Sequence, residues 1–130
     1  MPRWISSLRR SLPLLVLAAA LSCDDFSSPR QSDWYAASIM SPNGAEGSAL
    51  LEITGEVTEV TSESARVFFR ANAGVTRAIL VLPEAGTLRF RVRLASVAPP
   101  PDTRIVMIGG PSDSLRLNLA GYRVQYRAAP

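Results

Sequence analysis

The sequence predicts an all-β protein, an antiparallel sandwich of about seven short strands. Apolar and polar residues alternate with a period of two in several segments, which gives each segment one buried and one solvated face. Residues that favour turns separate these segments, at positions 41–44, 72–74, 83–86, 99–101 and 109–111. No stretch after residue 23 shows the spacing of an amphipathic helix. Short strands joined by turns therefore account for the domain.

The expected strands differ in how clearly the alternation marks them. In chain order they cover residues 34–40, 51–57, 66–70, 76–82, 87–94, 104–108 and 122–127. The clearest is 87–94, where leucine, phenylalanine and valine alternate with arginine, and 51–57 and 122–127 alternate in the same way. Strands of this number and spacing are typical of an immunoglobulin-like β-sandwich, and a small barrel is the alternative.

The first 23 residues have the layout of a helical secretory signal peptide. Residues 1–10 contain three arginines and no acid, and residues 12–21 form an uncharged apolar run that Asp24 and Asp25 follow closely. A helix of that run covers about 15 Å, roughly half of the hydrocarbon core of a bilayer. We therefore predict three parts: a removed signal peptide at residues 1–22, a flexible polar tether at 23–33, and the β domain at 34–130.

The segment Ala20-Leu21-Ser22-Cys23 resembles the lipobox of bacterial lipoproteins, with a small serine just before the cysteine. In that family the cysteine thiol receives a diacylglyceryl group, a dedicated peptidase cuts before the cysteine, and the new amine is often acylated too. The resemblance implies a lipid anchor on Cys23 and a location at the cell envelope. Asp24 matches the inner-membrane signal of similar enteric lipoproteins, but inner or outer membrane stays open. The alternatives are an ordinary signal peptide cut near Ala20, with Cys23 a free thiol, and an uncleaved anchor.

The domain also resembles the small immunoglobulin-like or cohesin-like β-sandwich modules of bacterial lipoproteins whose function is uncharacterised. The resemblance is carried by the strand pattern, by SPNGAEGSALLEITG at residues 41–55, and by LNLAGYRVQYR at residues 117–127. It implies the sandwich fold and no functional residue.

The distribution of charge argues against nucleic-acid binding. The net charge is +3, and all 14 positive side chains are arginines, since the chain has no lysine and no histidine. Three of these arginines precede residue 23, which leaves 14 − 3 = 11 arginines against 11 acids. A neutral domain lacks the excess positive charge that phosphate backbones require.

The strongest candidate ligand site is a ladder of arginines, Arg89, Arg91 and Arg93, on the solvated face of one predicted strand. Such side chains lie about 6–7 Å apart, which would suit anionic lipid heads, an acidic polysaccharide or a carboxylate-bearing partner. We favour a plainer interpretation, in which this solvated face pairs with Glu52 and Glu56. An immunoglobulin-like order would place their strand beside the ladder.

Two pairs of adjacent aromatic residues are further candidates. Exposed Trp34 or Tyr35 could stack on a sugar ring, although we expect Trp34 to lie in the core. Phe68 and Phe69 must face opposite sides of a strand, so one of them is either buried at a sheet edge, as we expect, or exposed for a partner.

Composition argues against catalysis, metal binding and cofactors. Without histidine there is no Ser-His-Asp triad, and without lysine there is no Ser-Lys dyad or Schiff base. The lone Cys23 can form neither an internal disulfide nor a cysteine-rich zinc site. Asp102, Asp113 and Asn118 do not follow the spacing of a calcium loop, and the glycine-rich loop 109–114 lacks the Lys-Ser/Thr ending of a phosphate loop.

The expected function is therefore non-catalytic binding or scaffolding at the cell envelope by a tethered β-sandwich. Its expected partners are the membrane, through Cys23, and an envelope protein or surface glycan, through loops or an edge strand. The alternatives are a carbohydrate- or anionic-polymer-binding module, a secreted soluble protein, and an enzyme with two converging acids.

Overall fold

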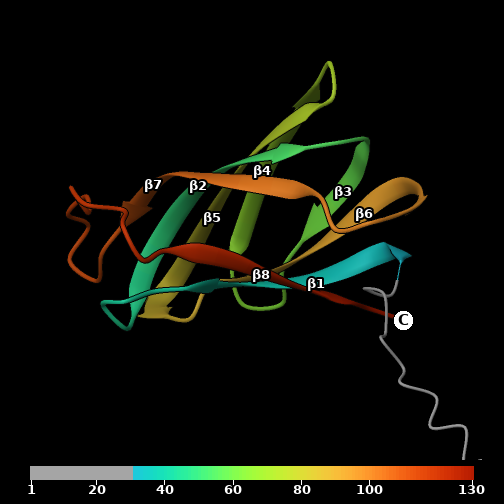
Figure 1. The fold of residues 1–130 in the computed structure, drawn as a ribbon. Coiled ribbons are helices and arrows are strands. Elements are labelled where there is room, and N and C mark those ends of the chain that lie inside the picture. The colour runs from blue at the N-terminus through green and yellow to red at the C-terminus, as the bar shows by residue number, and fades with distance from the viewer. Residues whose placement is uncertain (1–30) are drawn as a thin grey trace, which may run out of the picture.

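The chain folds into two stacked antiparallel sheets of four strands each, which confirms the predicted all-β sandwich (Figure 1). The computed structural model describes residues 31–130. The predicted signal peptide, Cys23 and the predicted tether up to residue 30 lie outside the described residues. The first strand begins at Ser32, so the last two residues of the predicted tether belong to the domain.

Eight strands make up the two sheets. They are β1 (Ser32–Met40), β2 (Glu46–Thr54), β3 (Val57–Thr61), β4 (Arg66–Asn72), β5 (Val75–Gly86), β6 (Arg89–Ala98), β7 (Asp102–Gly109) and β8 (Arg123–Ala128). Sheet A has the order β3-β6-β1-β8, and sheet B has the order β4-β5-β2-β7. Every link except the β4–β5 hairpin crosses from one sheet to the other.

The structure has one strand more than the sequence predicted, because the predicted strand 51–57 is broken. Its first residues belong to β2, and Val57 begins the separate strand β3. Gly55 has a φ of 130°, which residues with a Cβ rarely adopt, and its N–H donates to the oxygen of Gly74 at 2.8 Å. The chain therefore leaves sheet B after Thr54 and enters sheet A at Val57. Because Val57 faces the same core from the opposite sheet, the apolar alternation continues across the break and hides it.

The strand order differs from the immunoglobulin-like order expected for segments 51–57 and 87–94. β2 lies in sheet B and β6 in sheet A, so the two strands are not neighbours. The predicted turn at 83–86 is also wrong, because these residues extend β5 to Gly86. Pro83 is tolerated there because it lies in a bulge, between the paired residues Val81 and Gly86.

Alternate residues of the strands form the core between the sheets, as a period of two requires. Its buried apolar side chains are Tyr35, Ala37, Ile39, Ala49, Leu51, Ile53, Val57, Val60, Ala78, Leu80, Leu88, Phe90, Val92, Leu94 and Ile108. Tyr126 packs edge-on against Tyr35 and Phe90, with ring centroids 6.1 and 6.2 Å away. Its hydroxyl lies 2.6 Å from that of Thr103, which ties β8 to β7, and burial raises the pKa of Tyr126 to about 12.

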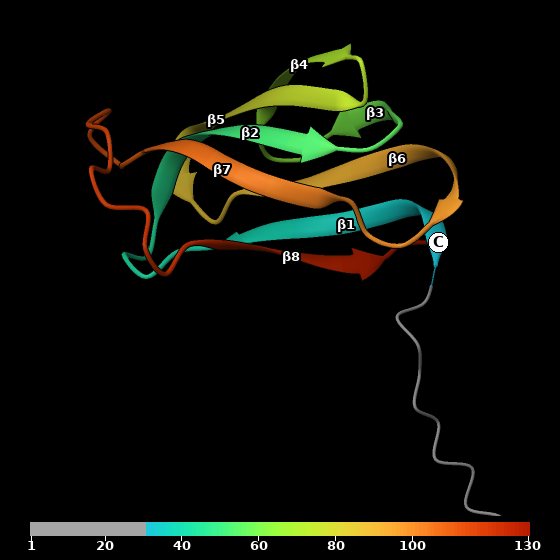
Figure 2. The same cartoon turned by 45° about the horizontal axis from the view of Figure 1, so that its top comes forward.

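The two ends of the sandwich carry different segments (Figure 2). The start of β1 and the end of β8 lie together at one end, where the N–H of Ala129 donates to the oxygen of Trp34 at 2.9 Å. The turn 41–45 and the segment 110–122 lie at the other end, where Asn43 Nδ2 donates to Tyr122 Oη at 2.8 Å. The chain that leads back to Cys23 therefore meets the domain at the first end.

Candidate functional site

The outer face of sheet A carries five arginines around its strand β1. Arg89, Arg91 and Arg93 point outward from β6 on one side of β1, and Arg123 and Arg127 point outward from β8 on the other side. We call these five residues the arginine face. The predicted ladder is thus one side of a wider basic surface. The alternation in 122–127 also marked the two residues of β8 as solvated, but local spacing did not place them near the ladder.

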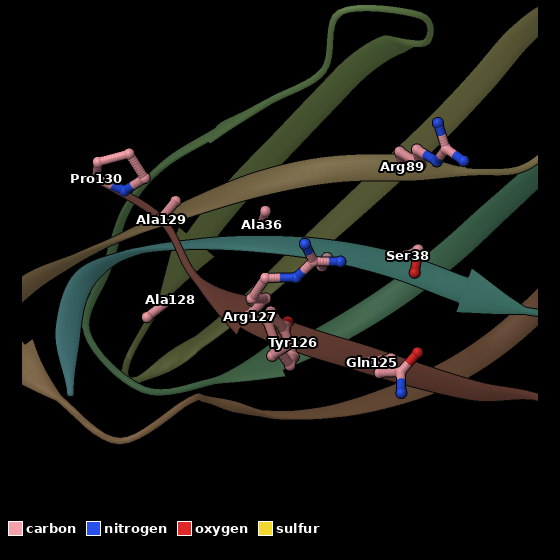
Figure 3. Close-up of a pocket in the computed structure, with 10 residues that line it drawn as sticks. Ala36, Ser38, Arg89, Gln125, Tyr126, Arg127, Ala128, Ala129 and Pro130 are labelled. Carbon is pink, nitrogen blue, oxygen red and sulfur yellow. The ribbon is translucent and has the colours of Figure 1, made fainter. Parts of the chain in front are cut away.

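Between the two rows of arginines, β1 forms the floor of a shallow trough (Figure 3). The outward residues Ala36 and Ser38 are small, whereas Arg89 stands opposite Ser38 on one side and Arg127 stands opposite Ala36 on the other. The trough has a volume of about 720 Å³ and is open to solvent. Strand spacing puts the two rows of arginines roughly 10 Å apart. That width admits an extended chain or a row of acidic groups.

Trp34 stands beside this trough, not in the core where the sequence prediction put it. Its half-buried ring lies under the guanidinium groups of Arg91 and Arg93, which are 5.0 and 5.6 Å from the ring centroid. Tyr35 points into the core instead and is fully buried, so it is not available to a sugar. The packing of Ile39 in the core sets this direction, because side chains of a strand alternate between its faces.

Most of the arginine face forms no salt bridge with the acidic residues that the structure describes. Arg93 Nε lies 3.8 Å from Asp33 Oδ2, and Glu59 of β3 is the cross-strand neighbour of Arg93. Among residues 31–130 the other four arginines of the face form no salt bridge. Arg91 donates instead to the oxygen of Pro130 at 3.4 Å. The face therefore has a positive potential that favours an anionic ligand.

The expected pairing of the ladder with Glu52 or Glu56 is wrong. Glu52 lies on the outer face of sheet B, where its carboxylate accepts from Arg104 at 2.7 Å and from Arg77 at 3.2 Å. The hydrogen bond from Arg104, together with the charges of both arginines, holds the pKa of Glu52 below its usual value. Glu56 follows β2, and its main-chain oxygen accepts from the N–H of Ala95.

One buried ionic cluster had no signal in the sequence. Glu46, at the start of β2, is only 2% exposed, and its carboxylate accepts from Ser41 Oγ at 2.7 Å, from the Tyr122 hydroxyl, and from Arg116 Nε at 3.0 Å. Burial raises the pKa of Glu46, but the hydrogen bonds from Tyr122, Ser41 and Arg116 and the charge of Arg116 outweigh burial and lower it. Because the chain itself supplies these donors, the cluster fastens segment 110–122 to β2 rather than presenting a free base.

The other predicted candidates do not come together. Phe68 lies on the outer face of sheet B and is 60% exposed, and Phe69 of the same edge strand β4 is 42% exposed, so the expected burial of one ring is wrong. Within residues 31–130 no three His, Cys, Asp or Glu side chains gather to hold a metal ion. No helix of the described part is long and apolar enough to span a membrane.

The fold and the site together define a β-sandwich with one basic, grooved outer face. Comparison with family models, with curated proteins and with solved structures found no match. The function proposed below therefore depends on the geometry of the arginine face and on the sequence before residue 31.

Proposed function

We propose that this chain is a lipid-anchored, non-catalytic binding module that binds anionic groups through the arginine face of sheet A. The observation that supports this proposal is the concentration of five arginines around β1, four of them without a salt bridge among the described residues. Like charges held together repel one another, and an anionic ligand relieves that repulsion. The small side chains of β1 leave the ligand a channel.

A linear anionic polymer at the envelope, such as an acidic polysaccharide, fits this face best. Arginines two residues apart repeat about every 6–7 Å along a strand, so successive acidic groups of a polymer can each meet a guanidinium. The planar guanidinium binds carboxylate or phosphate through two parallel hydrogen bonds. Trp34 adds a rigid aromatic surface beside the trough.

Removing the two walls of the trough is the direct test. Arg89→Ala/Arg127→Ala should weaken binding to polygalacturonate or polyphosphate at least about tenfold, because a hydrogen bond to a charged group contributes roughly 1.5–3 kcal/mol. Neither side chain has a salt bridge within residues 31–130, so folding should be unaffected. Binding is measured by titration calorimetry at several salt concentrations, with neutral dextran as the reference polymer.

The matched control is Arg66→Ala/Arg70→Ala, which removes the same charge from exposed arginines of sheet B. With a polymer short enough to occupy one arginine face, it should leave binding within about twofold of wild type, with a small change from the general field. An equal loss in both double variants would show attraction by net charge alone and contradict a site on sheet A.

The lipid anchor has its own test. Metabolic labelling with an acyl analogue should place label on the mature chain, whose N-terminus should be residue 23. Cys23→Ser should abolish the label and release the protein from the membrane fraction, because the serine cannot carry the thioether-linked lipid that we propose as the anchor. An unmodified thiol, or a mature chain that begins before Cys23, would rule the anchor out.

A further inference from the structure

The outer face of sheet B carries a continuous apolar band that crosses all four strands. Cross-strand register aligns its members in one row, Phe68 of β4 beside Ile79 of β5, then Leu50 of β2 and Met107 of β7. Phe68, Ile79 and Met107 are 60%, 44% and 44% exposed, and Leu50 is half-buried. We call these four residues the apolar band. Exposed apolar side chains gathered in this way mark an interaction surface.

The band has a projecting end and a hollow end. Phe68 projects from the edge strand β4. Toward β7 the surface sinks into a hollow of about 130 Å³, lined by Ser48, Leu50, Ile79, Met107 and Leu115. Each copy therefore carries both an exposed aromatic ring and an apolar hollow that can hold such a ring.

The charged residues in the row next to the apolar band are ordered so that opposite charges can meet between two copies. The next row along the strands reads Arg70, Arg77, Glu52 and Arg104 across the sheet. A twofold axis parallel to the strands, between β5 and β2, sets each β5 position against the equivalent β2 position of the other copy. Arg77, which pairs with Glu52 of its own copy at 3.2 Å, then also faces Glu52 of the other copy, and opposite charges meet at the centre of the interface. Arg70 comes to face Arg104, whose charge is already paired with Glu52 at 2.7 Å.

We propose that the outer face of sheet B is the interface with a second copy of this chain, related by that axis. Phe68 of each copy enters the hollow of the other beside Met107, and Ile79 lies against Leu50 of the partner copy. A twofold axis across the strands is disfavoured, because it would set Arg66 of one copy against Arg70 of the other. It would also place the N-terminal ends of the two β1 strands, where each chain enters its domain, at opposite ends of the dimer.

The position of the chain entry supports the same axis, in a step that depends on the proposed lipid anchor. Residue 31 meets the domain at the end where β1 starts and β8 finishes. An axis parallel to the strands keeps this end of both copies on the same side of the dimer. Both Cys23 anchors can then reach one membrane.

Thiol cross-linking tests the interface in the full chain. In one chain positions 70 and 104, in the row next to the apolar band, lie three strand spacings apart, about 14 Å. Facing sheets lie roughly 10 Å apart with their side chains pointing toward each other. A short bismaleimide reagent should therefore give covalent dimers of Arg70→Cys/Arg104→Cys, which keeps the apolar band intact, in the membrane fraction. Arg70→Cys alone and Arg104→Cys alone should stay monomeric.

A solution measurement keeps the test independent of the cross-linker. For the detergent-extracted protein, sedimentation should show that Phe68→Glu weakens self-association by about 30-fold or more, as loss of an aromatic anchor seated in a pocket does. Val97→Glu is the matched control, since Val97 is 64% exposed on β6 outside the band. It should leave self-association unchanged.

Three results would overturn this interface. They are a monomeric double cysteine variant, dimers of the Arg70→Cys variant alone, or cross-linking of the double variant to a protein of different mass. Reaction of the wild-type chain with the reagent would instead count against the lipid on Cys23. The interface would still be decided by the difference between the double and single variants.

Discussion

Replacing Glu46 by alanine is expected to lower the free energy of unfolding by about 3 kcal/mol, because a buried ion pair that loses one member leaves the other uncompensated. Glu46 is 2% exposed, and it holds Ser41, Arg116 and Tyr122 together. The Arg116 side chain keeps 28% exposure and can still reach water. Because Arg116 is partly exposed, we expect the loss of unfolding free energy to lie at the lower end of the range for broken buried ion pairs.

Chemical denaturation followed by circular dichroism measures this effect, and hydrogen exchange shows where it acts. Amides of segment 110–122 should lose protection first, because Arg116 and Tyr122 fasten that segment to β2 through Glu46. Glu84→Ala is the matched control, because Glu84 is exposed on β5 and its loss should change stability by less than about 0.5 kcal/mol. Similar stability of the two variants would show that the cluster does not fasten the segment.

The same carboxylate makes stability depend on pH in a known direction. The folded-state pKa of Glu46 is below its usual value of 4.5, since its hydrogen bonds and the charge of Arg116 outweigh burial. A lowered folded-state pKa stabilises the fold above the unfolded-state pKa, and this contribution is lost as pH falls through the folded value. Glu46→Gln should therefore reduce the fall in stability below about pH 4.5.

The sequence could locate strands wherever one face is buried, but it could not assign them to sheets. The alternation at 87–94 corresponds to β6, and that at 122–127 corresponds to β8, because residues two apart must share a face. Leu51 and Val57 show the same alternation on different sheets, because both sheets bury their side chains in one core. Sheet membership depends on pairing between distant segments, which leaves no local pattern.

The candidate site was predictable to the same extent. The ladder of Arg89, Arg91 and Arg93 was found because its spacing defines one face of one strand. Its trough was not, because β1 comes between β6 and β8 only through long-range pairing. The donors of Glu46 lie up to 76 residues away along the chain, so no spacing rule could connect them.

The two outer faces have complementary roles if both proposals hold. Packing sheet B of one copy on sheet B of another covers the apolar band and leaves the two arginine faces on opposite sides of the dimer. A dimer would then hold two segments of an anionic polymer, and binding of the first raises the effective concentration for the second. Variants of the apolar band should therefore reduce avidity for long polymers more than affinity for short ones.

The adjacent aromatic residues Trp34 and Tyr35 provide the sharpest contrast in expected stability. Tyr35→Ala should lower the free energy of unfolding by about 4 kcal/mol, because it opens a cavity in the core and removes a bonded hydroxyl. Tyr35 is fully buried, its hydroxyl donates to the oxygen of Ala98, and the N–H of Ser32 donates to it at 3.0 Å. Tyr35→Phe removes the hydroxyl alone and should cost about 1 kcal/mol, which keeps the test readable should the alanine variant fail to fold.

Trp34→Ala should cost no more than about 1 kcal/mol, since the half-buried ring lies on the outer face of the sheet under Arg91 and Arg93. Denaturation followed by circular dichroism compares the three variants directly. If Trp34→Ala were less stable than Tyr35→Ala, the two faces of β1 would be exchanged, with Trp34 in the core and Tyr35 outside. Its small outward residues Ala36 and Ser38 would then face the core, and the trough between the arginines would not exist.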